Sequence, residues 1–195
     1  MVYNIYEFKG NITRQSCRDF LFQSAMKSYL AEQGVDKEID IGSMICRTEK
    51  GKPYIQYAGV KFNISHSDDY WVCIIGQGEC GVDVQKIKTV NYGKLASRFF
   101  SENEEAYVST NGSRGFFKLW ARREAFAKYT GEGFFSKMPD FVGDDGELLQ
   151  EVAIADGGSA DCFTAYLREL EISEDTVCVY CTGGKDDEIR VFAKR

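Results

Sequence analysis

The order of the predicted elements is the feature that most constrains the fold of this chain. A strand-like N-terminus precedes a helix-like segment over residues 13–32, in which apolar residues recur at helical spacing up to Gly34. Strand-like runs come next, at residues 40–46, 61–64 and 70–75.

The same order returns in the second part of the chain. A strand-like run at residues 81–84 is followed by helix-like segments near residues 94–109 and 115–130. Four further strand-like runs lie at residues 148–154, 162–167, 176–181 and 189–193. A helix followed by a short antiparallel sheet, twice, predicts an α+β fold with two pseudo-symmetric halves. We place the halves at residues 1–79 and 80–195 and expect the active site between them, where ligands often bind.

Composition excludes several classes of protein. The 195 residues are 44% hydrophobic and 28% charged, as in an ordinary globular protein. No run approaches the roughly 18 apolar residues of a membrane helix, and the N-terminus lacks a secretory apolar region, so we expect a cytoplasmic protein. The net charge of −6 argues against nucleic acid or an anionic membrane as the main partner. Any anionic ligand must therefore be held by local positive charge.

The seven cysteines are odd in number and scattered, mostly within apolar runs. This usage is typical of buried thiols in a reducing compartment. Cys178 and Cys181 have the spacing of a metal or redox pair, but a strand would point them to opposite faces.

Residues 117–128 predict a helix with charges at the margin of the core. Arg123 falls inside its apolar arc, whereas Glu124 and Lys128, four residues apart, stack at the edge of that arc. The arc comprises Phe116, Leu119, Trp120, Phe126 and Ala127. Buried charges need partners, which favours a functional site. The alternative is a Glu–Lys pair on a solvated face.

Three other segments concentrate polar groups. Residues 81–85 place Asp83 and Gln85 on one face of a strand. Residues 62–67 put His66, the only histidine, at a strand end, and we expect residues 65–69 to form a turn. A lysine lies in a tight turn in Gly51-Lys52-Pro53. Taken singly, each segment is also explained by ordinary turn chemistry.

Together, five ordered segments resemble the 4′-phosphopantetheinyl transferases, specifically the broad-specificity, two-halved kind that activates peptide synthetases such as surfactin synthetase. The segments are GKP (51–53), FNISHS (62–67), GVDVQK (81–86), RFFSENE (98–104) and WARREAFAK (120–128). The resemblance is strong because their order and spacing are shared, although each segment alone is weak.

This resemblance implies transfer of the phosphopantetheine arm of coenzyme A to a serine of a carrier protein, with release of 3′,5′-ADP. It implies Mg²⁺ held by Asp83, Glu124 and the position of Gln85, and a phosphate-stabilising role for Lys128. Asp83, Glu124 and Lys128 would thus be catalytic. Whether Glu124 or a metal-bound water is the base stays open.

The resemblance also assigns contacts to coenzyme A. Arg14 aligns best with an arginine that meets the 3′-phosphate, and Arg18 lies one turn later on the same face. The other matching positions are Lys52, Pro53, Ser65, His66, Arg123 and Lys128, while Glu104 matches a second acid near the metal water. Gln85 departs from the family pattern by replacing a carboxylate, and Arg123 departs by replacing a lysine.

The implied partner is an acyl or peptidyl carrier protein, usually a helical bundle with an acidic face. Candidate docking residues are Lys86, Lys88, Lys94 and Arg98, with Phe134 and Phe135 as apolar candidates. We expect a monomer. One alternative is a non-catalytic binding protein, for which Gln85 is the only support. The other is an unrelated α+β protein with a structural His66, in which Asp83 and Glu124 would lie far apart.

Overall fold

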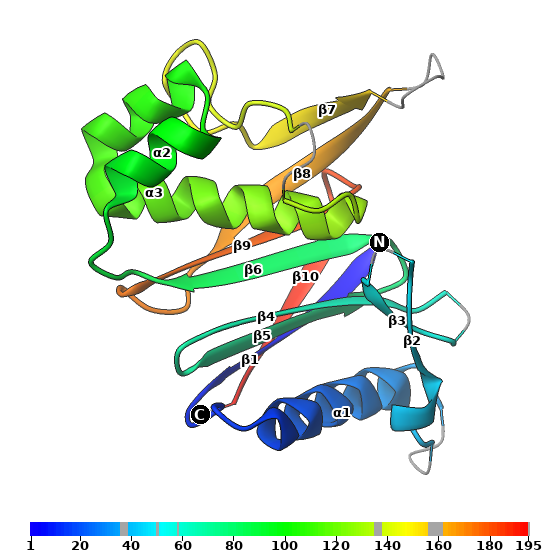
Figure 1. Ribbon diagram of the computed structural model, residues 1–195. Coiled ribbons are helices and arrows are strands. Elements are labelled where there is room, and N and C mark those ends of the chain that lie inside the picture. Colours follow the sequence, from blue (N-terminus) through cyan, green and yellow to red (C-terminus); the bar gives the residue numbers. More distant parts are fainter. Residues whose placement is uncertain (36–38, 50, 58, 135–137, 156–161, 195) are drawn as a thin grey trace.

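The computed structural model shows two sheets stacked between helices (Figure 1). It describes residues 1–195 except 36–38, 50, 58, 135–137, 156–161 and 195. The helices are α1 (Gln15–Glu32), α2 (Tyr92–Phe99) and α3 (Glu102–Thr130), with a 3₁₀ turn at Gly42–Met44. Helix α1 covers the outer face of one sheet, and α3 covers the outer face of the other. The predicted α+β class is confirmed.

The first sheet has the strand order β10-β1-β5-β4. Its strands are β1 (Val2–Lys9), β4 (Lys61–Ser67), β5 (Tyr70–Gly76) and β10 (Glu188–Lys194). Pairs β1–β5 and β4–β5 are antiparallel, while β1 and β10 are parallel. The last strand of the chain therefore completes a sheet that is otherwise built from residues 2–76.

The second sheet is antiparallel throughout, in the order β6-β9-β8-β7. Its strands are β6 (Cys80–Lys86), β7 (Glu151–Ala155), β8 (Cys162–Leu170) and β9 (Thr176–Thr182). A separate two-stranded ribbon pairs β2 (Ile45–Arg47) with β3 (Pro53–Ile55). Strand β6 is at the edge of the second sheet and faces the first.

Three apolar clusters fill the spaces between these layers: one between α1 and the first sheet, one between the sheets, and one under α2 and α3. Cys178 belongs to the cluster between the sheets and Cys181 to the cluster under α3. The prediction that they face opposite sides is confirmed. The six cysteines whose side chains the structure describes are free thiols.

The structure corrects some predicted boundaries. The strand expected at residues 40–46 is instead the 3₁₀ turn Gly42–Met44 followed by the short β2. The turn expected at residues 65–69 shrinks to Asp68 and Asp69, because β4 continues to Ser67. The helices expected at residues 94–109 and 115–130 become α2 and a longer α3, which bends at Gly112, where φ is 62°. Among the described helices, none combines the length and apolarity needed to cross a lipid bilayer.

Candidate functional site

Side chains of β4, not its backbone, hold the free edge of β6. Residues at alternate positions of a strand share one face, and β4 presents three oxygens to β6 in this way. Asn63, Ser65 and Ser67 accept hydrogen bonds from the backbone N–H groups of Val82, Val84 and Lys86, at 3.2, 3.2 and 3.0 Å. Otherwise these buried N–H groups at a sheet edge would lack partners. The period-two spacing of Asn63, Ser65 and Ser67 is the sequence signal for this arrangement, which we did not predict.

Gly81 lets β6 approach α3 closely. A Cβ atom placed on Gly81 would lie 2.0 Å from the backbone oxygen of Ala125 and 2.6 Å from the backbone nitrogen of Tyr129. Any larger residue would force the strand and the helix apart. The glycine therefore brings the β6 residue Asp83 beside the C-terminal turns of α3, where Glu124 and Lys128 lie.

Asp83 is buried and fully engaged. Its Oδ1 accepts hydrogen bonds from the Ser65 hydroxyl at 2.8 Å and from the Lys128 ammonium at 2.7 Å, and its Oδ2 accepts one from Gln85 Nε2 at 2.7 Å. Lys128 also donates to the backbone oxygen of Val82 at 3.0 Å. The expected shared face of Asp83 and Gln85 is confirmed, since Val82 and Val84 lie in the core between the sheets.

Glu124 is the second carboxylate of this cluster. Burial raises its pKa, the negative charge of Asp83 raises it further, and Lys128 lowers it in part. No described side chain donates a hydrogen bond to Glu124. Two carboxylates here share one ammonium group, which leaves excess negative charge in a largely buried place. Hence the alternative that requires Asp83 and Glu124 to be far apart is wrong.

The donor set suits a hard divalent cation. Two carboxylates and the Gln85 amide provide the oxygen ligands that Mg²⁺ prefers, with further positions open to water and phosphate oxygens. Within the described ranges, no group of three or more His, Cys, Asp and Glu side chains is arranged to hold a metal.

His66 lies at the rim of the cluster on an exposed strand position. Its pKa is lowered by partial burial, then by Arg18 and Lys128, while Asp83 raises it. A lowered pKa keeps the imidazole neutral at pH 7. Ser65, in contrast, is buried. Its hydroxyl donates to Asp83 and accepts from the backbone N–H of Val84 in β6.

The two candidate arginines near α1 differ in position. Arg14 is the exposed residue that precedes the helix. Arg18 lies close enough to lower the pKa of His66, and it donates to the backbone oxygen of Ile12 at 2.7 Å. Arg18 is therefore the arginine that the fold directs toward the cluster.

Lys52 and Pro53 lie beside the C-terminus of α3. Lys52 pairs with Glu79 at 3.0 Å and donates to the backbone oxygen of Tyr129 at 3.2 Å. Pro53 opens β3. Lys52 thus links the turn before β3 to the helix that carries Glu124 and Lys128.

Arg123 pairs with Glu104. Its Nη1 donates to Glu104 Oε2 at 2.8 Å, and its guanidinium lies over the rings of Phe100 and Phe141. Glu104 is completely buried, caps the start of α3 and accepts from the backbone N–H of Phe141 at 3.1 Å. These contacts are structural; the expectation of a coenzyme A contact for Arg123 stays a prediction.

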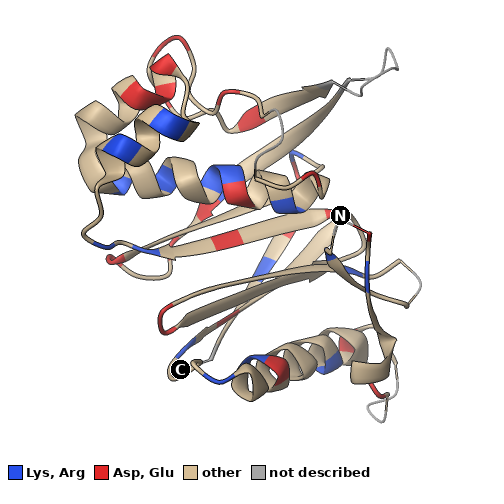
Figure 2. Cartoon of the chain, viewed as in Figure 1, with Lys and Arg blue, Asp and Glu red and all other residues tan. Residues whose placement is uncertain are grey.

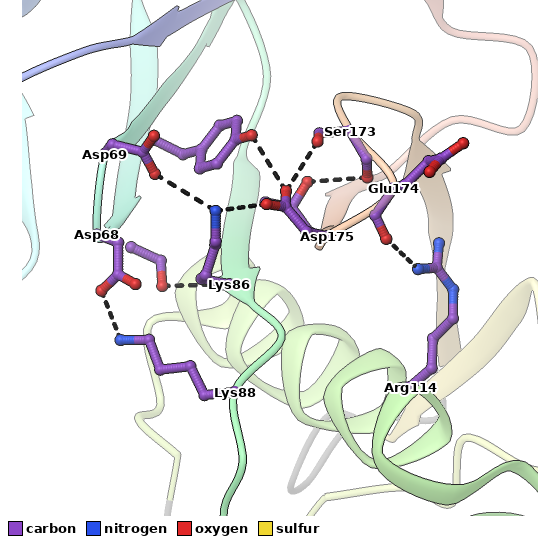
Figure 3. Close-up of polar contacts among 11 residues, drawn as sticks. Asp68, Asp69, Lys86, Lys88, Arg114, Ser173, Glu174 and Asp175 are labelled. Carbon is purple, nitrogen blue, oxygen red and sulfur yellow. Dashed lines mark hydrogen bonds and ion pairs between the residues drawn. The ribbon is translucent and has the colours of Figure 1, made fainter.

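Two of the four basic docking candidates are engaged within the chain (Figure 3). Lys86 pairs with Asp175 at 2.5 Å, and Lys88 pairs with Asp68 at 2.5 Å. The contact with Lys86 is the main reason that the pKa of Asp175 falls to about 2. Lys94 and Arg98 remain exposed on α2. Phe134 packs on Trp120, with ring centroids 4.6 Å apart, and Phe135 lies outside the described residues.

Comparison with known proteins indicates the family of this chain. A sequence model of the 4′-phosphopantetheinyl transferase superfamily matches residues 79–180, which include β6 and α3. The chain is 30% identical over 140 residues to the 4′-phosphopantetheinyl transferase gsp of Aneurinibacillus migulanus, covering 70% of this chain and 56% of the relative. It is 31% identical over 146 residues to a 4′-phosphopantetheinyl transferase of Bacillus subtilis, covering 71% of this chain and 62% of the relative. The chain thus spans about three fifths of the length of these relatives. With more than half of its residues matched by the superfamily, the chain belongs to the 4′-phosphopantetheinyl transferase superfamily.

Proposed function

We propose that the protein transfers the 4′-phosphopantetheine arm of coenzyme A to a serine of an acyl or peptidyl carrier protein, and releases 3′,5′-ADP. In this reaction a bond forms between the serine Oγ and the β-phosphorus as the bond to the 3′,5′-ADP oxygen breaks. Membership of the superfamily supports the proposal. The observation that carries it is the convergence of Asp83, Glu124 and Lys128 from β6 and α3.

The reaction is proposed to depend on Mg²⁺. Asp83 and Glu124 would hold the ion, with Gln85 as an amide ligand or through water. The excess negative charge at these two carboxylates supports this assignment. When bound, Mg²⁺ would neutralise negative charge on the pyrophosphate of coenzyme A.

The chain's own residues would bind and orient the phosphates. Lys128 carries an ammonium group beside both carboxylates, from where it can donate to a transferring phosphate oxygen. His66 and Arg18 together offer a neutral donor and a fixed positive charge at the rim. Arg14, Lys52, Pro53 and Arg123 remain proposed contacts of coenzyme A.

Glu124 is the proposed base for the serine proton, unless a metal-bound water takes that role. Its raised pKa makes it a better proton acceptor than an ordinary carboxylate. It also has no described hydrogen-bond donor that would have to be displaced before the proton arrives. Because its oxygens accept no described hydrogen bond, the Glu124 carboxylate could either bind a cation or accept a proton.

The carrier protein is proposed to dock on α2. Lys94 and Arg98 are exposed there, and basic positions follow one another along α2 and α3 (Figure 2). We expect Arg98→Ala to raise the KM for an acidic carrier about threefold to tenfold with little change in kcat. A charge at the edge of an interface mainly affects the rate at which the two proteins associate. Lys88→Ala is the matched control and should leave KM unchanged, since its ammonium is paired with Asp68. Equal effects of both changes would contradict docking on α2.

Loading assays test the proposed function directly. Purified protein, coenzyme A and a panel of fatty acid, polyketide and peptide carriers are incubated with Mg²⁺, and the mass gain of each carrier is measured. We expect loading of at least one carrier, loss of loading with EDTA, and recovery with Mg²⁺. Asp83→Asn should abolish loading, and circular dichroism checks that this variant is still folded at the assay temperature. Failure of every carrier would overturn the proposal.

A non-catalytic binding protein is the second candidate, supported by Gln85 in place of a carboxylate. Calorimetric titration of coenzyme A with and without Mg²⁺ separates the two. Binding without any gain from the metal, together with no loading, would favour the binding protein. The proposal also includes a cytoplasmic monomer, which size-exclusion chromatography with light scattering and cell fractionation would test.

A further inference from the structure

Ser65 of β4 contacts both the backbone of β6 and the carboxylate of Asp83. Its hydroxyl donates to Asp83 Oδ1 at 2.8 Å, and its Oγ accepts from the backbone N–H of Val84 at 3.2 Å. Strand β4 is an edge of the first sheet and β6 is an edge of the second, and the two strands lie side by side (Figure 1). A single serine thus connects one sheet to a carboxylate that the other sheet carries.

The hydroxyl of Ser65 has no hydrogen left for another acceptor. A serine hydroxyl contains one hydrogen, so it donates one hydrogen bond at a time. Ser65 is 7% exposed and Asp83 is 2% exposed, so water competes little for this hydrogen. The resemblance implies that Ser65 contacts coenzyme A. An ionised phosphate oxygen only accepts, however, and would have to replace Asp83 as the acceptor.

The same contact distinguishes the two oxygens of Asp83. A carboxylate oxygen accepts about two hydrogen bonds. Oδ1 accepts from Ser65 at 2.8 Å and from Lys128 at 2.7 Å, whereas Oδ2 accepts from Gln85 alone among the described residues. The accepting capacity of Oδ1 is therefore used, and Oδ2 keeps capacity for a further partner.

We propose that Ser65 is a positioning residue for Asp83 and not a contact of coenzyme A. By occupying Oδ1 together with Lys128, it would leave Oδ2 as the oxygen of Asp83 that binds a divalent cation. Carboxylates that ligate metals are commonly held by such outer hydrogen bonds. The inference rests on the proposed function, because it concerns the same cation.

Ser67 provides a matched control. It lies two residues further along the same face of β4, and its Oγ accepts from the backbone N–H of Lys86 at 3.0 Å. Among the described residues, Ser67 makes no hydrogen bond to Asp83. Ser65→Ala and Ser67→Ala each remove one acceptor for a β6 N–H group, and only Ser65→Ala also removes a donor to the carboxylate.

A double-mutant cycle without metal or coenzyme A tests the contact itself. Urea denaturation in EDTA gives the unfolding equilibrium constants of Ser65→Ala, Asp83→Ala and the double variant. We expect the two effects to depart from multiplicativity by about threefold or more, as for groups in contact. The cycle of Ser67→Ala with Asp83→Ala should be multiplicative within about twofold.

Titration calorimetry tests the positioning role. The dissociation constant of coenzyme A is measured in EDTA and in Mg²⁺, and the ratio of the two gives the gain from the metal. Ser65→Ala should reduce this gain about tenfold, while its dissociation constant in EDTA stays within about twofold of the wild type. Ser65→Thr keeps the hydroxyl and should restore the gain, and Ser67→Ala should leave it unchanged. These measurements need no change at Asp83, so they decide the matter even if Asp83→Ala fails to fold.

Three results would overturn the proposal. One is a cycle of Ser65 and Asp83 without coupling. Another is weaker binding of coenzyme A to Ser65→Ala in EDTA with an unchanged gain from the metal, which would identify Ser65 as a contact of coenzyme A. The third is an equal loss of the gain in both alanine variants, which would mean that weaker attachment of β6 is responsible.

Failure of the proposed function gives a different result. A wild-type protein that loads no carrier and gains nothing from Mg²⁺ would contradict the proposed transferase reaction. The cycle in EDTA would still decide whether Ser65 holds Asp83, because it needs neither the metal nor the substrate.

Discussion

Helix α3 carries two glutamates, the fully buried Glu104 and the partly buried Glu124, that differ in how completely their carboxylates are hydrogen-bonded. Near its start, Glu104 accepts from Arg123, from the backbone of Ser101 and from the backbone of Phe141. Near its end, Glu124 lies beside Asp83 and Lys128 without a hydrogen-bond donor among the described side chains. A saturated group holds the fold together, whereas an unsaturated one has capacity left for a ligand or a proton.

The pKa values follow the same division. Burial raises the pKa of Glu104, Arg123 and two backbone N–H groups lower it in part, and Asp140 adds a smaller increase. For Glu124, both burial and the nearby Asp83 raise the pKa, and only Lys128 opposes them. The comparison therefore predicts that substitutions at one end of α3 affect stability and those at the other affect activity.

The largest expected effect is on stability. Glu104→Ala leaves the Arg123 guanidinium buried and unpaired, and should lower the free energy of unfolding by about 3–5 kcal/mol. Urea denaturation followed by circular dichroism measures this loss. Glu102→Ala, at an exposed position of the same helical turn, should cost less than about 1 kcal/mol. A loss for Glu104→Ala no greater than that for Glu102→Ala would remove the distinction between the two groups.

The next effect is on turnover. Glu124→Ala should slow carrier loading at least ~10²-fold, the scale for losing one strong electrostatic group in an active site. Its free energy of unfolding should be unchanged or higher, because no described hydrogen bond is lost and a partly buried carboxyl group with a raised pKa is removed. Glu102→Ala again serves as the control and should load at the wild-type rate. A fully active Glu124→Ala would show that this end of α3 is structural as well.

The pH dependence of stability sharpens the comparison. A carboxyl group whose pKa is raised in the folded state destabilises that state when ionised, and the penalty disappears as pH falls through the folded pKa toward the unfolded value of about 4.3. Glu124→Gln should therefore be more stable than the wild type at pH 7, on the order of 1 kcal/mol. The difference should shrink toward pH 4.3. Thermal unfolding from pH 4 to pH 8 measures it, and a constant difference would contradict the assignment.

An effect of similar size concerns the metal. Gln85→Glu adds a third carboxylate beside Asp83 and should tighten Mg²⁺ binding in the presence of coenzyme A about threefold to tenfold, at most about 1.4 kcal/mol. Calorimetric titration measures the change. Gln85→Met removes the amide oxygen and should not tighten binding. Equal affinities for these two variants would mean that residue 85 does not face the ion.

Local periodicity was sufficient to predict much of the site. Strand alternation placed Asp83 with Gln85, and helical spacing placed Glu124 with Lys128 at the core margin; the structure confirms both. The order of helices and strands predicted the α+β class. These inferences succeed because strand and helix periods act over only a few residues.

Contacts between distant residues could not be predicted in this way. The helical arc showed Arg123 among apolar neighbours, but its partner Glu104 lies 19 residues earlier and across the bend at Gly112. Likewise, Arg14 and Arg18 share a helical face, and only the packing of α1 shows that Arg18 lies nearer to His66. The parallel pairing of β10 with β1 joins segments from the two ends of the chain, and no pattern within either segment predicts this pairing.

The edge of β6 has a consequence for how the molecule can adapt. Hydrogen bonds between backbone groups of paired strands do not depend on which side chains the strands carry. The hydrogen bonds that join β6 to β4, in contrast, are accepted by the side chains of Asn63, Ser65 and Ser67, which substitutions can replace. Shortening or removing one of them would weaken the contact between the two sheets without removing a backbone hydrogen bond from either sheet. The position of Asp83 relative to the first sheet thus depends on side chains that single substitutions can change.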